Sequence, residues 1–325
     1  MATYKEIHGV KVQYRDSDAT AIAGDVWYNS SFGVLKMYSS VGAWATAGNV
    51  NTARAYLAGS GTQTAGIIMA GGPGSKDETE TYDGSSWTET ADVNTARMNL
   101  AGTIQGTSTA TLVAGGYVAP AVQDVVESWD GSSWTEIADL NSARRTLTGA
   151  GTQTAGIVMG GSTAGAPIAP GVTGIAETWN GTSWTEVGDL NTARYGPVGS
   201  GTTTAALCYG GNGPSPGANT ESFNGTAWTE LADLSTGRTM LGGGGSQTSS
   251  LAYGGGEPGA SSAKTEEWDG SSWTEVGDLA TARDGLTGAT GTSNTTGFAA
   301  TGGDPAAVGA EEWSGVATIE TVAFD

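Results

Sequence analysis

Residues 80–97 read E-T-Y-D-G-S-S-W-T-E-T-A-D-V-N-T-A-R, and much of the chain repeats this stretch with small changes. A second copy begins at Glu127, and further copies begin at Glu177, Glu221 and Glu266. The tryptophan in each copy and the arginine that ends it recur at matching intervals of 43 to 50 residues. A recurring interval of this length predicts an array of similar structural units.

Three residue types recur once in each unit. The tryptophans are Trp44, Trp87, Trp134, Trp184, Trp228 and Trp273. The arginines are Arg54, Arg97, Arg144, Arg194, Arg238 and Arg283. The glutamates are Glu80, Glu127, Glu177, Glu221, Glu266 and Glu311. Residues repeated in this way are expected to serve the packing of the units.

The composition of the 325-residue chain fits one repeat domain. Its 54 glycines recur at fixed places in the units, which indicates turns rather than disorder. With 33 acidic against 13 basic residues the net charge is -20, so neither nucleic acid nor an anionic membrane is an expected partner. No apolar run is long enough to span a membrane, and the N-terminus lacks the apolar core of a signal peptide.

Within the first complete unit the sequence predicts four strands: residues 56–60, 65–70 and 79–82, and a strand that starts at Trp87. The first strand is made of small residues and suits a crowded centre. The second is a continuous apolar run that suits burial on both faces. Asp83-Gly84, between the third and fourth strands, predicts a type I′ hairpin turn, which needs positive φ.

Four antiparallel strands in about 45 residues make the unit of a β-propeller, an all-β fold in which each blade covers its neighbour. A β-solenoid has shorter rungs and no Asp-Gly hairpins, and we reject it. Six copies of the first and second strands predict six blades. A seventh blade would require residues 25–47 to form a partial blade.

The ends of the chain are harder to place. Residues 1–50 predict an N-terminal lead, and residues 51–325 predict the propeller. The last unit lacks its closing tryptophan, so its fourth strand is expected either from residues 318–324 or from the segment at Trp44. The lead predicts three strands, then a turn before the strand at Trp44: residues 10–14, 25–29 and 34–38.

The order of arginine, apolar run, Gly-Gly, Glu-x-aromatic-Asp and tryptophan resembles the kelch repeat, which forms β-propellers. The second unit carries it at Arg97, Gly115-Gly116, Glu127, Trp129-Asp130 and Trp134, and the resemblance covers residues 54–313. In the lead, G-D-V-W-Y-N-S-S-F-G-V-L-K-M-Y is similar to an element of structural proteins of tailed phages, particularly of marine cyanobacterial viruses. This second resemblance implies a virion component.

The repeated residues allow two interpretations each. The tryptophans could stack on sugars, but identical placement in nearly every blade favours packing against the next blade. The glutamates and arginines occur in equal numbers, and we expect inter-strand or inter-blade ion pairs between them. The alternative for the arginines is a ring around the central channel that binds an anion.

The sequence predicts no catalytic residue, no cofactor and no metal ligand. Copper oxidases on kelch propellers need clustered histidine, tyrosine and cysteine, whereas this chain has His8 outside the repeats and Cys208 in a buried strand. T-Y-D-G-S-S-W is one residue too short for the Asp-box of sialidase propellers, and G-G-P-G-S-K at residues 71–76 has the wrong spacing for a phosphate loop. A calcium site among the aspartates stays an alternative.

The connection between the second and third strands differs most from unit to unit. In a propeller these connections share one face with the links between blades, and the uniform G-T-Q-T and D-G-S-S turns occupy the other. Variation on one face of a rigid scaffold favours recognition there, although unconstrained linkers would vary as well. The expected contact loop is residues 162–176, with five contact residues: Ala164, Pro167, Ile168, Pro170 and Val172.

These features predict a non-enzymatic phage virion surface protein of the tail-fibre or receptor-binding type. Its loops would recognise a glycan or protein of the host surface, and residues 1–50 would bind other virion proteins. The protein is expected as a homo-oligomer or in several copies on the particle. The alternatives are a capsid or tail decoration subunit that contacts only virion proteins, and a glycan-degrading propeller enzyme.

Overall fold

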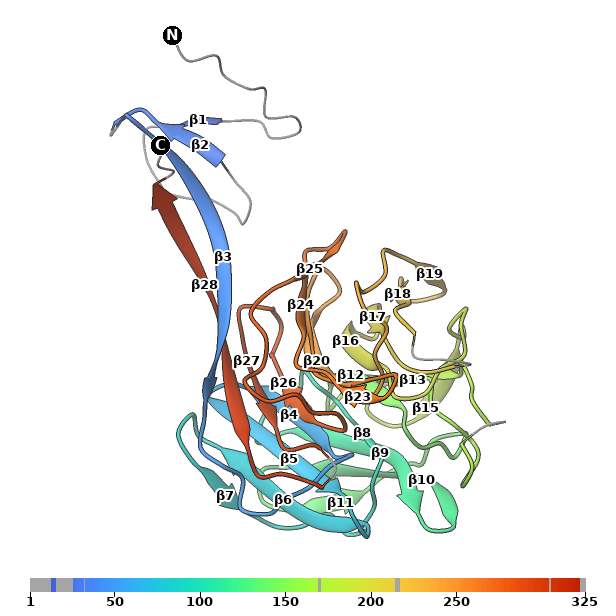
Figure 1. The fold of residues 1–325 in the computed structure, drawn as a ribbon. Coiled ribbons are helices and arrows are strands. Elements are labelled where there is room, and N and C mark those ends of the chain that lie inside the picture. The colour runs from blue at the N-terminus through green and yellow to red at the C-terminus, as the bar shows by residue number, and fades with distance from the viewer. Residues whose placement is uncertain are drawn as a thin grey trace. The chain divides into compact units, whose positions relative to one another are not determined.

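The computed structural model describes residues 13–15, 26–31, 33–168, 171–213, 217–303 and 305–321. Within these ranges every regular element is a β-strand. These residues therefore contain no helix that could cross a membrane. The chain divides into two compact units, one of residues 44–314 and one that combines residues 1–43 and 315–325. Figure 1 shows the larger unit as a ring of four-stranded sheets.

Five blades of the ring are built from strands that are consecutive in the sequence. Blade 1 contains β4 (Ala58–Thr62), β5 (Ala65–Gly71), β6 (Lys76–Tyr82) and β7 (Trp87–Glu89). Blade 2 contains β8 (Ala101–Gly102), β9 (Thr111–Val118), β10 (Ala121–Trp129) and β11 (Trp134–Glu136). Blade 3 contains β12 (Thr148–Thr152), β13 (Ala155–Met159), β14 (Ala176–Trp179) and β15 (Trp184–Val187). Blade 4 contains β16 (Val198–Thr202), β17 (Ala205–Tyr209), β18 (Thr220–Phe223) and β19 (Trp228–Glu230). Blade 5 contains β20 (Gly242–Ser246), β21 (Ser249–Tyr253), β24 (Thr265–Trp268) and β25 (Trp273–Glu275), with a small hairpin of β22 (Gly256–Glu257) and β23 (Ala260–Ser261).

The sixth blade joins the two ends of the chain. It contains β26 (Thr287–Ala289), β27 (Thr296–Ala300), β28 (Ala310–Thr321) and, as its fourth strand, β3 (Val34–Thr46). The amide of Ala47 donates to the carbonyl of Ala310 at 2.9 Å at the end of this pairing. The ring therefore has the six blades predicted, and the alternative of seven is wrong. Closure uses the segment at Trp44, whereas residues 318–321 belong to the third strand.

The structure corrects the predicted turn between residues 38 and 44. β3 runs without interruption from Val34 to Thr46. The small polar residues Ser39, Ser40 and Gly42 resemble a turn in the sequence, but β28 lies beside this segment and pairs with its backbone.

The smaller unit contains two further strands. β1 (Gln13–Arg15) pairs in parallel with β2 (Val26–Asn29), and β2 pairs antiparallel with β3. The predicted strand at 25–29 thus corresponds to β2. Of the predicted strand at 10–14, residues 10–12 lie outside the described part of the chain.

The first strands of the six blades surround the axis of the ring. Each contacts the first strands of both adjacent blades, and together they close a circle: β4, β8, β12, β16, β20 and β26. They line a cavity of about 90 Å³. A Cβ atom on Gly149 of β12 would come within 2.5 Å of the carbonyl oxygen of Gly102 on β8, so this close approach requires glycine. The centre is crowded as expected, although the first strand of blade 1 starts at Ala58 rather than at Tyr56.

The connection between the third and fourth strands is a hairpin, as predicted, but it is not a type I′ turn. In blade 1, Tyr82 pairs with Trp87, and of the four residues between them only Gly84 has positive φ, 92°. Asp83 Oδ1 accepts hydrogen bonds from the backbone amides of Ser85 and Ser86, both at 2.8 Å. This Asx turn fixes the hairpin without a second left-handed residue.

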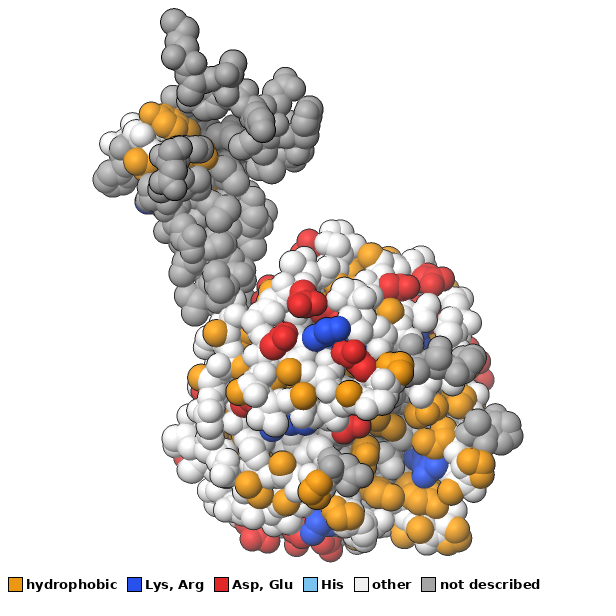
Figure 2. Space-filling view, viewed as in Figure 1, with side chains coloured by type: hydrophobic (Ala, Val, Ile, Leu, Met, Phe, Trp, Pro, Cys, Tyr) orange, Lys and Arg blue, Asp and Glu red, His pale blue; other side chains and the backbone are white. Residues whose placement is uncertain are grey.

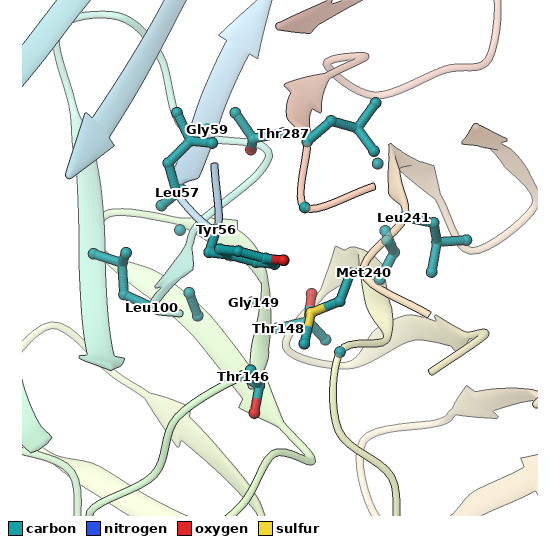
Figure 3. Close-up of a pocket in the computed structure, with 18 of the residues that line it drawn as sticks. Tyr56, Leu57, Gly59, Leu100, Thr146, Thr148, Gly149, Met240, Leu241 and Thr287 are labelled. Atoms are coloured by element: carbon teal, nitrogen blue, oxygen red, sulfur yellow. The ribbon is translucent and has the colours of Figure 1, made fainter. Parts of the chain in front are cut away.

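A closed ring of backbone hydrogen bonds surrounds one end of the cavity. Six residues, each two positions after a repeat arginine, donate their amide to the carbonyl of the preceding member at 2.7–2.9 Å: Tyr56, Asn99, Thr146, Gly196, Met240 and Gly285. All six have φ between 51° and 63°. Figure 3 shows the Tyr56 side chain extending across the cavity toward Met240.

Positive φ in this ring should be costly for β-branched residues. We expect Gly196→Val to lower the free energy of unfolding by about 2 kcal/mol, because the new Cβ would be strained at φ 63°. It would also lie 2.8 Å from Thr239 Oγ1 and 2.9 Å from Met240 Sδ. Thr146→Gly, at the equivalent position, should cost less, because relief of the strain at φ 51° offsets the loss of the hydrogen bond from its hydroxyl to the carbonyl of Arg145. Urea denaturation measures both changes, and an equal loss in both variants would contradict this explanation.

Candidate functional site on the loop face

Each repeat arginine forms a buried ion pair with the glutamate of the blade that follows it in the sequence. The pairs are Arg54–Glu80 at 2.7 Å, Arg97–Glu127 at 3.0 Å, Arg144–Glu177 at 2.8 Å, Arg238–Glu266 at 2.8 Å, Arg194–Glu221 and Arg283–Glu311. All of these side chains are at most 5 % exposed. None of these arginines lines the central cavity, so the alternative of an anion-binding arginine ring is wrong.

The pair at Arg144 shows how these residues join two blades. Its Nη2 donates to Glu177 Oε1, and its Nη1 donates to the carbonyls of Gly160 at 3.0 Å and Ile175 at 2.6 Å, all within blade 3 or its connections. The carbonyl of Arg144 accepts a hydrogen bond of 2.8 Å from the amide of Gly116 in blade 2. The side chain therefore braces its own blade while its backbone holds the preceding blade.

An asparagine that was not predicted as part of the pairs completes four of them. Asn141 donates its backbone amide and its Nδ2 to Glu177 Oε2, both at 2.8 Å, and Nδ2 also donates to the carbonyl of Trp184 at 3.2 Å. Asn51, Asn94 and Asn191 repeat these contacts. The available signal was the asparagine that stands three residues before the arginine in these units.

The repeated tryptophans lie between blades. The ring centroid of each lies 4.7–5.4 Å from that of the third-strand aromatic residue of its own blade. Five of them donate the indole N–H to the preceding blade or the link that leaves it: Trp44, Trp134, Trp184, Trp228 and Trp273. Trp87 instead packs against Phe298 of blade 6 at 5.5 Å. These contacts favour packing over sugar stacking.

Cys208 lies in the core, as expected. It is fully buried in β17, and burial raises the pKa of its thiol to about 12. Among the described residues no group of three or more histidine, cysteine or acidic side chains could hold a metal ion.

The variable connections share one face with the links between blades, which we call the loop face. Isolated bridges join the residue after five of the repeat arginines to a residue at or beyond the end of the second strand: Ala55–Gly72, Met98–Tyr117, Arg145–Ser162, Tyr195–Asn212 and Thr239–Gly256. The two uniform turns of each blade occupy the opposite face, which we call the turn face.

On the loop face, blades 2 and 3 carry the most apolar connections. We define the blade 2–3 surface as residues 117–122, Arg145, 162–168 and 171–175, a set without any carboxylate. A Cβ atom on Gly165 would lie 2.8 Å from the carbonyl oxygen of Pro120, so the two connections pack against each other. Figure 2 shows hydrophobic side chains gathered in the region of the hairpin that joins β9 and β10.

The structure places four of the five predicted contact residues on this surface. Ala164, Ile168 and Val172 are half-buried and Pro167 is exposed, whereas Pro170 lies outside the described residues. Arg145 was not among the predicted contact residues; its guanidinium carbon lies 4.3 Å from the centroid of the Tyr117 ring. Burial lowers the pKa of Arg145, and the Tyr117 side chain opposes this effect.

Comparisons with known proteins define the fold and no more. Neither a protein-family model nor a curated protein matches the chain. Among solved structures, one titled "Structure of YjhT" aligns with a TM-score of 0.68 at 14 % sequence identity. The alignment covers 85 % of this chain and 99 % of that one. At this identity the similarity supports a shared propeller architecture.

Proposed function

We propose that this chain is a non-enzymatic surface protein of a phage particle, of the tail-fibre or receptor-binding type. The loop face binds a glycan or protein of the host surface, and residues 1–50 bind other virion proteins. The resemblance of the lead to phage structural proteins supports the location on a virion.

The observation that carries the recognition role is the blade 2–3 surface. It is apolar and free of carboxylates on a chain whose net charge is -20. Ala119, Pro120, Ala166 and Pro167 are exposed there. An apolar patch on an acidic protein is typical of an interaction site, since burial in a complex removes its contact with water.

The state of the acidic side chains supports a role without catalysis. Glycosidases need two carboxyl groups that face the substrate, one of which can give up a proton near neutral pH. Each repeat glutamate is instead buried against an arginine. The exposed Asp83 and Asp130 accept hydrogen bonds from neighbouring serines, which lower the pKa of each carboxyl to about 2.

Binding of the labelled full-length protein to host cells tests the recognition role. We expect Pro167→Asp to weaken binding at least about tenfold, because it places a charge in the apolar contact surface. Thr154→Asp is the matched control, since it adds the same charge to an exposed turn-face residue of the same blade. Equal loss in both variants, or in neither, would show that the loop face is not the binding surface.

Immunogold labelling of purified particles tests the location. If immunogold labels the particles but the purified protein does not bind cells, the chain is a decoration subunit instead. Unlabelled particles would contradict a virion role, and glycan release by the purified protein would identify an enzyme.

A further inference from the structure

Arg145 differs from every other arginine side chain that the structure describes. Each of the six repeat arginines has a glutamate within 3.0 Å. Arg145 is 7 % exposed, against 0–4 % for the repeat arginines, yet no ion pair or hydrogen bond of its guanidinium exists within the described part of the chain. Its Nε is buried without a partner, as it is in four of the repeat arginines, so Arg145 differs from them in having no carboxylate beside it.

The surroundings of Arg145 offer it only an aromatic ring. Tyr117 lies under the guanidinium, with 4.3 Å between the guanidinium carbon and the ring centroid. A cation–π contact recovers part of the hydration that the charge loses on burial, but much less than a carboxylate would. Burial of most of this side chain without a counter-ion therefore carries a cost in the isolated chain.

This cost is not a requirement of the fold. Met98 occupies the equivalent position in blade 2, where it forms the same backbone bridge, to Tyr117, that Arg145 forms to Ser162. An uncharged side chain thus satisfies the same place in the repeat. The charge at residue 145 is consequently free to serve a ligand.

We infer that Arg145 anchors a protein-binding site on the blade 2–3 surface, and that the partner presents a carboxylate side chain surrounded by apolar residues. The carboxylate would accept hydrogen bonds from the guanidinium and supply the missing counter-charge. The partner's apolar rim would cover the exposed ends of the two connections at Pro120 and Pro167. Arginine and tyrosine within an apolar, water-excluding rim are typical of the centre of a protein interface.

The side chains around Arg145 favour a protein over a sugar. Apart from Thr163, every exposed or half-buried side chain within residues 118–122 and 162–168 is aliphatic or absent. Sugar hydroxyls need several side-chain hydrogen-bond partners, and sugar rings prefer an exposed aromatic face. A second copy of this chain is disfavoured, because each copy has a net charge of -20. The choice of a protein partner rests on the proposed recognition role of the loop face.

The test uses the full-length protein labelled with ¹⁵N at arginine, observed through its Nε–H resonances. The Arg145 resonance is identified by its absence from the spectrum of Arg145→Met, a change to the residue that blade 2 already carries. The probe is the peptide acetyl-Leu-Glu-Leu-amide, and its control is acetyl-Leu-Gln-Leu-amide. We expect the glutamate peptide to shift the Arg145 resonance and to bind at least about tenfold more tightly than the control, because charged hydrogen bonds are stronger than neutral ones.

Several results would overturn the inference. No shift with the glutamate peptide, or equal binding of both peptides, would show that Arg145 recognises no carboxylate. A larger shift with sodium glucuronate at the same concentration would assign the site to an acidic sugar. Self-association that Arg145→Met abolishes, measured by sedimentation velocity, would assign it to a second copy. Unfolding of Arg145→Met, measured by its melting, would give Arg145 a structural role.

The peptide titration and the particle experiments can fail separately. A shift of the Arg145 resonance with unlabelled particles would leave the carboxylate site in place and remove the virion role. If immunogold labels the particles and the protein binds cells, but the resonance does not shift, the virion role stays and the carboxylate site is removed.

Discussion

Replacing Arg144 with alanine is expected to lower the free energy of unfolding by about 3–5 kcal/mol, as for other buried ion pairs that lose one partner. The change leaves the Glu177 carboxylate buried without its counter-ion. It also removes the hydrogen bonds to the carbonyls of Gly160 and Ile175. Urea denaturation followed by tryptophan fluorescence measures the loss.

A half-buried ion pair in the same protein provides the control. Lys76 lies 3.3 Å from Glu78, and both side chains are about one quarter exposed, 27 % and 25 %. Lys76→Ala should change the stability by no more than about 1 kcal/mol. If Arg144→Ala cost no more than this control, the repeat pairs would not brace the blades.

Removal of residues 1–46 should be at least as damaging, because it deletes the fourth strand of blade 6. The Trp44 ring lies 5.4 Å from Trp313 and 4.8 Å from Tyr253 between ring centroids, and its indole N–H donates to Thr265 Oγ1 at 2.9 Å. Trp44 is half-buried, and loss of a fully buried tryptophan side chain costs about 3–5 kcal/mol, so loss of Trp44 together with its whole strand should cost at least as much. We expect the melting temperature of the propeller to fall by about 10 °C or more.

A shorter truncation separates ring closure from loss of the lead. Removing residues 1–33 deletes β1 and β2 but keeps all of β3. The near-ultraviolet circular dichroism of this variant should melt close to the full-length temperature. Similar melting of both truncated proteins would show that β3 is dispensable for the propeller.

The fold could be predicted where the units repeat. The recurrence of tryptophan, arginine and glycine in register predicts four-stranded blades and six of them, because packing between blades needs the same residue at the same place each time. The segment that supplies the fourth strand of blade 6 could not be predicted, because both ends of the chain carry an incomplete unit. The ring of six backbone hydrogen bonds around the cavity could not be predicted either, because tyrosine, asparagine, threonine and methionine give no common signal for positive φ.

The candidate site was predicted only in part. Variation of the loops pointed to residues 162–176, and the structure places Pro167 and Val172 of that loop on the blade 2–3 surface. Arg145 follows Arg144 directly, and in the sequence the two look alike. Only the three-dimensional arrangement separates them, since it gives Arg144 a glutamate and Arg145 a tyrosine ring.

Closure of blade 6 by β3 sets an order of events during synthesis. β3 ends at Thr46, and its partner β28 begins at Ala310, more than 260 residues later. At about 5–20 residues per second, a ribosome needs roughly 10–50 s to make the intervening chain. Throughout that time the part of β3 beyond Met37 has no partner strand, because only its first residues pair with β2, and Trp44 has no Trp313 to pack on. The ring can close only when translation is nearly finished, so a nascent chain that stalls in the later blades would keep an open strand edge available for aggregation.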